Sequence, residues 1–80
     1  MSVKDAVANR FSGLCREMGI RVNALANISG VTPSTVYSLL DPRRGDVSII
    51  TIKKLCDGLG ISLSEFFNAP EFDALEQEIE

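Results

Sequence analysis

Apolar residues recur along the first part of the chain at a helical spacing. Between residues 3 and 18 they follow one another at intervals of three or four, as Val3, Val7, Phe11, Leu14 and Met18. This period places them on one face of a helix, whereas a strand would alternate at every second residue. Ser2 and Asp5 form the pattern of a capping box, and Gly19 is a typical stop. The spacing predicts a helix over residues 3–18.

Two short helices follow, separated by a turn that contains Gly30. The first is predicted over residues 22–29. The second is predicted over residues 33–40, because a capping Thr32 followed by Pro33 at the first helical position is a strong start signal. Two short helices joined by a glycine-containing turn of three or four residues describe a helix-turn-helix.

Two more helices are predicted after the polar loop of residues 41–47. Ser48 caps a helix over residues 49–59, and a second capping box opens a helix over residues 63–68. The apolar stripe expected on the 49–59 helix consists of Ile49, Ile52, Leu55, Cys56 and Leu59. With no alternating strand pattern and no internal repeat, the fold class is all-α.

The C-terminal segment differs from the rest in charge. Residues 1–70 hold all eight basic side chains and six acidic ones, a formal charge of +2, whereas residues 71–80 hold five acidic side chains and no basic one. The overall charge of −3 therefore reflects an acidic tail over residues 70–80, and the domain over residues 1–69 is weakly basic. Affinity for a polyanion would have to come from locally placed cations.

The composition argues against an enzyme. The chain has 80 residues and no histidine, which removes an imidazole base, a Ser-His pair and histidine metal ligands. A helical domain of this size also has little room for a large pocket. We therefore expect a macromolecular partner, no cofactor, no metal and no small-molecule ligand.

Two cysteines, Cys15 and Cys56, show no C-x-x-C spacing, which predicts reduced, buried thiols in a cytoplasmic protein. No apolar run is long enough for a membrane span, and the N-terminal residues do not have the pattern of a signal peptide.

The pattern over residues 7–67 resembles the Cro/repressor-like, or Xre-type, helix-turn-helix domains of bacteria and phages. The matching segments are Leu25-Ala26, Gly30-Val31-Thr32, Ser34-Thr35-Val36, Leu39, Ser48-Ile49 to Leu55, Leu59-Gly60-Ile61-Ser62 and Glu65-Phe66. The resemblance implies a compact five-helix lambda-repressor-like domain that binds double-stranded DNA in a sequence-specific manner. It further implies a transcriptional repressor, encoded by a bacterium or phage, that inserts the 33–40 helix into the major groove as a homodimer.

The resemblance also assigns contacts by position. Base readout falls to residues along the exposed side of the 33–40 helix, namely Thr32, Pro33, Ser34, Tyr37 and Ser38. Phosphate contacts fall to Arg21, Asn23, Thr35, Arg43 and Arg44. Thr32 could serve as a helix cap alone or have both roles, Tyr37 could simply be exposed, and the two loop arginines could be a solvated pair.

On the surface expected to meet DNA, three positions depart from the family pattern. Val22 stands where a glutamine is frequent, and Pro33 and Ser38 stand where long donors are frequent. The readout surface is therefore poor in long hydrogen-bond donors, which predicts modest specificity for each half-site or reliance on DNA shape.

Association with a second copy is predicted from apolar residues outside the main stripes. These are Ile50, Phe67, Phe72, Leu75 and Ile79. Phe66 and Phe67 are not expected to face one small core together, and exposed apolar surface often marks an interface. Alternatively, Phe72 and Leu75 fold back on the same chain. A second functional hypothesis is an antitoxin or protein-interaction module that uses this hydrophobic C-terminus.

Overall fold

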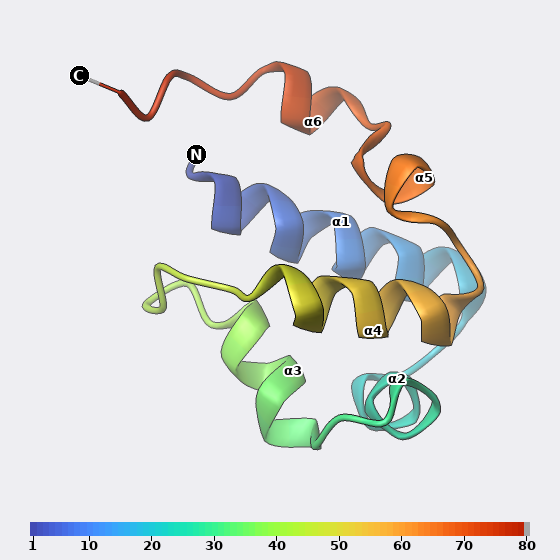
Figure 1. Ribbon diagram of the computed structural model, residues 1–80. Coiled ribbons are helices and arrows are strands. Elements are labelled where there is room, and N and C mark those ends of the chain that lie inside the picture. Colours follow the sequence, from blue (N-terminus) through green and yellow to red (C-terminus); the bar gives the residue numbers. More distant parts are fainter. Residues whose placement is uncertain (80) are drawn as a thin grey trace.

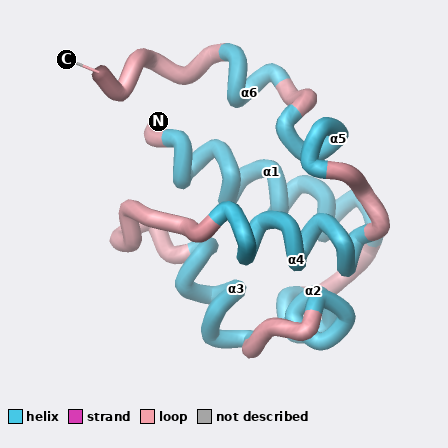
Figure 2. Tube along the Cα trace, in the orientation of Figure 1, coloured by secondary structure: helices cyan, strands magenta, loops and turns pink. Residues whose placement is uncertain are grey.

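Six helices and their connecting loops make up the computed structural model, which describes residues 1–79 (Figures 1 and 2). They are α1 (Val3–Met18), α2 (Val22–Ser29), α3 (Pro33–Leu40), α4 (Ile49–Leu59), α5 (Leu63–Phe67) and α6 (Pro70–Asp73). No strand occurs within the described residues, so the all-α prediction is confirmed. Glu80, part of the predicted acidic tail, lies outside the described residues.

The predicted caps form, which explains why the helix boundaries could be read from the sequence. Ser2 and Ser62 each accept a hydrogen bond from the backbone N–H three residues later, and both capping boxes are complete. Ser48 accepts from the N–H of Ile50 at 3.1 Å. These side chains satisfy backbone donors that a helix leaves unpaired in its first turn.

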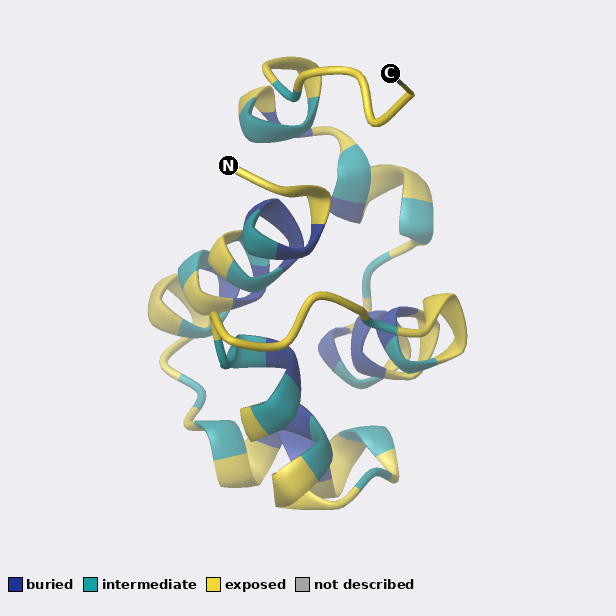
Figure 3. Cartoon of the chain, turned by 90° about the vertical axis from the view of Figure 1, so that its left-hand side faces the viewer, coloured by how far each residue is buried: buried dark blue, intermediate teal, exposed yellow. Residues whose placement is uncertain are grey.

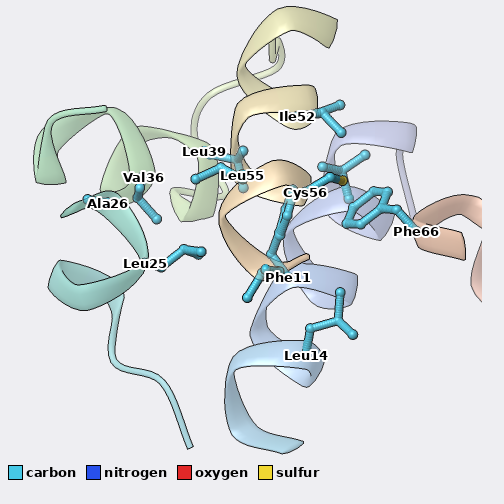
Figure 4. Packing of buried hydrophobic residues seen from close by; sticks show 12 residues of the cluster. Phe11, Leu14, Leu25, Ala26, Val36, Leu39, Ile52, Leu55, Cys56 and Phe66 are labelled. Atoms are coloured by element: carbon cyan, nitrogen blue, oxygen red, sulfur yellow. The ribbon is translucent and has the colours of Figure 1, made fainter. Parts of the chain in front are cut away.

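The core lies where α1, α2, α3 and α4 meet. Figure 4 shows Phe11 of α1, Leu25 of α2 and Val36 of α3 directed into the space that these helices enclose. All three are at most 1% exposed. Leu55 and Cys56 of α4 complete this contact, so the middle of each predicted apolar stripe is buried as expected.

The ends of two predicted stripes are exposed. Val3 and Met18 occupy the two ends of α1, and Ile49 is the first residue of α4 with 54% of its surface exposed. The expectation that these residues face the core was wrong, because both helices extend beyond the elements that cover their middle turns.

Four phenylalanines form an aromatic cluster that joins Phe11 of the core to three rings from α5 and α6. The ring of Phe66 lies 4.3 Å from Phe11, 4.9 Å from Phe67 and 5.8 Å from Phe72, measured between centroids. Phe66 is fully buried, while Phe67 and Phe72 are half-buried against the same core. The expectation that Phe66 and Phe67 could not share one core was wrong, because Phe67 meets Phe66 edge-on and α6 brings Phe72 to cover both.

The helix-like spacing after Pro70 produces only one helical turn. α6 ends at Asp73, and Leu75 and Ile79 lie in the irregular segment that follows. Arg10 of α1 holds α5 in place by donating hydrogen bonds to the carbonyl oxygens of Phe66 at 2.8 Å and Glu65 at 3.0 Å. Those carbonyls lie at the end of α5, where a cation is favoured by the helix dipole.

The two thiols pack differently. Cys56 is fully buried, as predicted, whereas Cys15 is only half-buried. Burial raises the pKa of both thiols above the ordinary value. Both groups are therefore held in the protonated form, which favours a packing role over a reactive one.

Candidate nucleic-acid interface

The turn between α2 and α3 has the geometry that the sequence predicted. Gly30 adopts a φ of 70°, a left-handed conformation that glycine tolerates without strain. The N–H of Val31 donates to the carbonyl of Ala26 at 3.1 Å, closing the end of α2. Ala26 is completely buried, and its small side chain lets the two helices approach each other.

Helix α3 turns its apolar side inward and its polar side outward. Val36 and Leu39 are buried against the rest of the molecule. Of the residues assigned to base readout, Thr32, Pro33, Ser34 and Tyr37 are exposed, and Ser38 is half-buried. The structure therefore brings these five residues together along one accessible side of α3.

The first turn of α3 is held by two threonines. The hydroxyl of Thr32 accepts a hydrogen bond from the backbone N–H of Thr35 at 3.3 Å and lies 2.9 Å from the Thr35 hydroxyl. The capping role of Thr32 is thereby confirmed, and its base contact stays a prediction. Because Thr35 is half-buried and already paired with Thr32, its hydroxyl is less free than that of the exposed Ser34.

Directly after α3 the chain forms a tight turn, Asp41–Arg44, here called the Asp41 turn. The N–H of Arg44 donates to the Asp41 carbonyl at 3.1 Å. One Asp41 carboxylate oxygen accepts from the backbone N–H of Arg43 at 3.0 Å, and the Arg43 guanidinium forms an ion pair with the same carboxylate at 3.0 Å. The turn thus projects two arginines, of which Arg43 has an internal partner.

The ion pair changes the titration of Asp41. Hydrogen bonds from the Arg43 side chain and backbone lower the pKa of Asp41 to about 2. Because the pKa falls on folding, the pair contributes stability that is fully present above the ordinary value of 3.8 and is lost as the pH falls through about 2. The ion pair between Asp41 and Arg43 is therefore formed at neutral pH.

A shallow hollow of about 260 Å³ lies between α3, the 41–47 loop and the start of α4. Its lining combines hydroxyl groups with one cation and one acid, from Thr35, Ser38, Leu39, Arg44, Asp46, Val47, Ser48 and Thr51. Arg44 has no ion pair within the described residues, so its guanidinium is available to an anion at this edge of α3. Figure 3 shows that most of the 41–47 loop is exposed.

The other predicted phosphate contacts lie at the start of α2. Arg21 is the N-cap residue of α2 and makes no capping hydrogen bond with its side chain. Arg21 and Asn23 are both exposed. They are therefore free to reach an anion near the N-terminal end of α2, where backbone N–H groups also favour negative charge.

The acidic segment lies on the opposite side of the molecule from α3. In Figure 1, α6 and the residues after it lie at the top, α2 and α3 lie at the bottom, and α1 and α4 separate them. The view turned by 90° in Figure 3 shows the same arrangement. The accessible side of α3 is therefore not covered by the acidic segment.

The residues predicted for association do not form one continuous exposed surface. Ile50 is 62% exposed and Ile79 is 83% exposed. Phe67 and Phe72 are half-buried in the aromatic cluster, and Leu75 is half-buried. Much of the apolar area of the phenylalanines is thus already covered by the chain itself, and the assignment to a dimer interface stays a prediction.

One residue that supports this face was missed at the sequence level. Lys4 in α1 is only 3% exposed, and its ammonium group donates a hydrogen bond to the carbonyl oxygen of Asp41. The available signal was its position three residues before Val7, on the same face of α1 as the apolar stripe. At the sequence level Asp41 was treated only as part of the polar 41–47 loop, although its carbonyl and side chain hold the turn together.

The described residues contain no group of three or more His, Cys, Asp or Glu side chains that could hold a metal ion. None of the helices in residues 1–79 is both long and apolar enough to cross a membrane.

Comparison with known proteins places this chain in a family of DNA-binding domains. The family model described as the Cro/C1-type HTH DNA-binding domain matches residues 10–71 of this chain. That range contains the helix-turn-helix, the Asp41 turn and the aromatic residues of α5.

Relatives and a solved structure agree with this match. The HTH-type transcriptional regulator PuuR of Escherichia coli K12 is 35% identical over 66 residues, and PuuR of Shigella flexneri gives the same values. The match covers 82% of this chain, which spans 35% of the length of those relatives. The crystal structure of the prophage Lp1 protein 11 superposes with a TM-score of 0.82 at 29% identity, covering 94% of this chain and 100% of that one.

Proposed function

The chain belongs to the Cro/C1-type helix-turn-helix family of DNA-binding transcriptional regulators, and from this membership we propose that it is a repressor that binds a palindromic operator as a homodimer. In this proposal α3 lies in the major groove of each half-site. The expected setting is the cytoplasm of a bacterium, including one that carries a prophage, in line with the sources named for its relatives.

The observation that carries the proposal is the accessible polar side of α3. Thr32, Pro33, Ser34 and Tyr37 are exposed there, while Val36 and Leu39 anchor the helix from behind. Hydroxyl groups can donate to or accept from base edges, and the Pro33 ring can contact a thymine methyl. Because these side chains are short, we expect DNA shape to contribute to the choice of site.

Phosphate contacts would flank α3 on both sides in this arrangement. Arg44 and Arg43 project from the Asp41 turn beyond the end of α3, and Arg21 and Asn23 lie at the start of α2. Contacts to phosphate fix the position of a protein on the duplex without reading its sequence. The location of the acidic segment on the far side avoids repulsion within a Debye length of about 8–10 Å.

The homodimer is supported by exposed apolar residues outside α3. Ile50 and Ile79 are the most accessible members of the predicted set. Two half-sites one helical turn apart require the two α3 helices to be about 34 Å apart. Light scattering on a sizing column tests the association, and a monomer at high micromolar concentration would exclude a stable homodimer in free solution.

Selection of binding sites from random duplex DNA tests the proposed function directly. A palindromic consensus is the expected result, and failure to enrich any site would overturn sequence-specific binding. Arg44→Ala should weaken binding to all duplexes about tenfold for each half-site and lower the salt slope by about one for each bound subunit, because each subunit loses one phosphate contact. Ser34→Ala, a matched exposed change, should alter the preferred sequence and leave the salt slope unchanged.

The exposed pair Ile49 and Ile50 favours a second candidate, a protein-interaction module such as an antitoxin. An interaction through apolar contacts depends little on salt, whereas duplex binding through several phosphates weakens steeply as salt rises. Duplex binding that is absent at low salt would favour this second candidate.

A further inference from the structure

Lys4 is a buried charge whose role the DNA contacts leave unexplained. It lies in the first turns of α1, on the same face as Val7, and is 3% exposed. A buried ammonium group loses its hydration, so it is retained only where a specific partner compensates. The ammonium group of Lys4 donates a hydrogen bond to the carbonyl oxygen of Asp41, 37 positions away in the sequence.

That carbonyl is the point from which the Asp41 turn is built. It accepts a hydrogen bond from Lys4 and a second from the N–H of Arg44 at 3.1 Å. The Asp41 side chain meanwhile accepts from the backbone and the guanidinium of Arg43, at distances of 3.0–3.1 Å. The positions of both arginines therefore depend on how Asp41 is held.

Beyond Asp41 the loop next meets the core at Val47, and the residues between have little other support. Pro42, Arg43, Arg44 and Asp46 are all exposed, and Gly45 has open space around it. The hydrogen bond from Lys4 to Asp41 is thus a direct link between α1 and the turn that follows α3. Without it, the Asp41 turn would be connected to the domain only through the end of α3 on one side and through Val47 on the other.

We propose that Lys4 is a positioning residue for DNA binding, which fixes the Asp41 turn so that Arg44 meets a phosphate while α3 occupies the major groove. The inference rests on the proposed function. Lys4 does not touch the DNA itself, because its side chain is enclosed. It acts through the carbonyl of Asp41 on the backbone of Arg44.

A role in positioning differs from a role in stability. Replacing Lys4 by an apolar side chain of similar volume removes the desolvation cost of a buried charge and leaves no unpaired charge behind, because the Asp41 carbonyl is neutral and still accepts from the Arg44 N–H. Lys4→Met retains most of the apolar stem and removes the donor. We expect this variant to melt no lower than the wild type and to bind DNA less tightly.

The test measures binding of the full chain to a short duplex of random sequence at low salt, because phosphate contacts do not depend on the sequence. Lys4→Met should weaken binding about five- to tenfold and no more than Arg44→Ala, because it acts by displacing the same phosphate contact. Lys54→Met is the matched control, since Lys54 is an exposed lysine on α4. It removes the same charge and should weaken binding by less than about twofold.

A double-mutant cycle tests whether the effect of Lys4 on DNA binding depends on Arg44. If Lys4 acts through Arg44, adding Lys4→Met to Arg44→Ala should cause little further loss, whereas adding Lys54→Met should give an independent effect. Amide exchange provides a second readout: Lys4→Met should speed exchange at the Arg44 N–H and leave that of Leu55 in the core unchanged.

The outcomes separate the two proposals. If Arg44→Ala does not affect duplex binding, the proposed docking of this face fails, whatever Lys4 does. If Arg44→Ala weakens binding and Lys4→Met does not, only the role of Lys4 is overturned. A Lys4→Met chain that melts well below the wild type would also overturn it, in favour of a role in stability.

Discussion

The two ends of the molecule are stabilised in different ways. At one end, the aromatic cluster packs four rings with centroid distances of 4.3–5.8 Å between neighbours. At the other end, α3 is held by the smaller side chains of Ala26, Val36 and Leu39 and by hydrogen bonds to the Asp41 turn. The aromatic rings of α5 and α6 thus lie far from the face that is proposed to bind DNA.

This difference has a physical reason. A face that meets a hydrated polyanion has to keep its polar groups accessible, so it cannot be stabilised by covering it with aromatic rings. Its shape instead depends on backbone geometry, helix caps and a few directed hydrogen bonds. Substitutions at the two ends should therefore affect different measurements. Those in the aromatic cluster should change stability, and those around α3 should change DNA binding.

The largest expected effect comes from the aromatic cluster. Phe66→Ala should lower the free energy of unfolding by about 3–5 kcal/mol, because it removes the buried ring that contacts the other three. Urea denaturation monitored by circular dichroism measures this change. Measured under conditions where the variant is still folded, duplex affinity should match the wild type.

Phe67→Ala is the matched variant for comparison, since Phe67 belongs to the same cluster but is only half-buried. It should be less destabilising than Phe66→Ala. If folded Phe66→Ala lost duplex affinity as strongly as Arg44→Ala, the two ends would be coupled and the comparison would fail.

The second prediction concerns the contact between α2 and α4, which pack against each other extensively. A methyl group on Gly58 would overlap the hydroxyl of Ser29 and lie 3.1 Å from the Ser29 Cα. Gly58→Ala should therefore lower the free energy of unfolding by about 1–3 kcal/mol, as overpacking does. Thermal denaturation checks the effect.

Ser29 provides the control for that contact. Its hydroxyl is buried without a hydrogen-bond partner in the described part of the chain. Ser29→Ala should leave stability unchanged or slightly raised, because an unsatisfied buried polar group is removed. In the double variant, Gly58→Ala should be less destabilising than in the wild-type background, and simple additivity would argue against a direct clash.

The smallest effect is expected at the Asp41 turn. Asp41→Asn keeps an acceptor for the Arg43 N–H but removes the charge that holds the Arg43 guanidinium. Release of that side chain to a phosphate should raise duplex affinity about two- to fivefold, the value of an exposed ion pair. Fluorescence anisotropy at several salt concentrations measures the change.

The matched variant is Asp57→Asn in α4, because Asp57 pairs with Lys53 on an exposed helical face. It removes the same negative charge at a position where no DNA contact is proposed. An equal rise in affinity for both variants would show that general charge, not release of Arg43, is responsible.

Local signals made much of the fold predictable. The sequence places caps at Ser2, Thr32, Ser48 and Ser62 and a turn at Gly30, and each has its expected hydrogen bond or dihedral angle. These features depend on residues at most three or four positions apart. The exposed side of α3 could be predicted for the same reason, because Val36 and Leu39 define its buried side.

Other features depend on residues far apart in the sequence, and the periodicity did not reveal them. Ile49 continues an apolar stripe but is exposed, because no neighbouring element covers the first turn of α4. Phe67 was expected to lie outside the core and is half-buried, because α6 turns back and supplies Phe72. The stripe also gave no reason for a lysine to be buried among apolar residues.

The sequence by itself determined where each of the first four helices begins and ends, where α5 begins, which side of α3 faces outward, and the family to which the chain belongs. Only the tertiary structure decided that Lys4 meets the carbonyl of Asp41 and that the acidic segment lies away from α3. The physical reason is the separation along the sequence over which each interaction acts. Caps and helical periods act between neighbouring residues, whereas the partner of a buried charge is fixed only when distant helices pack together.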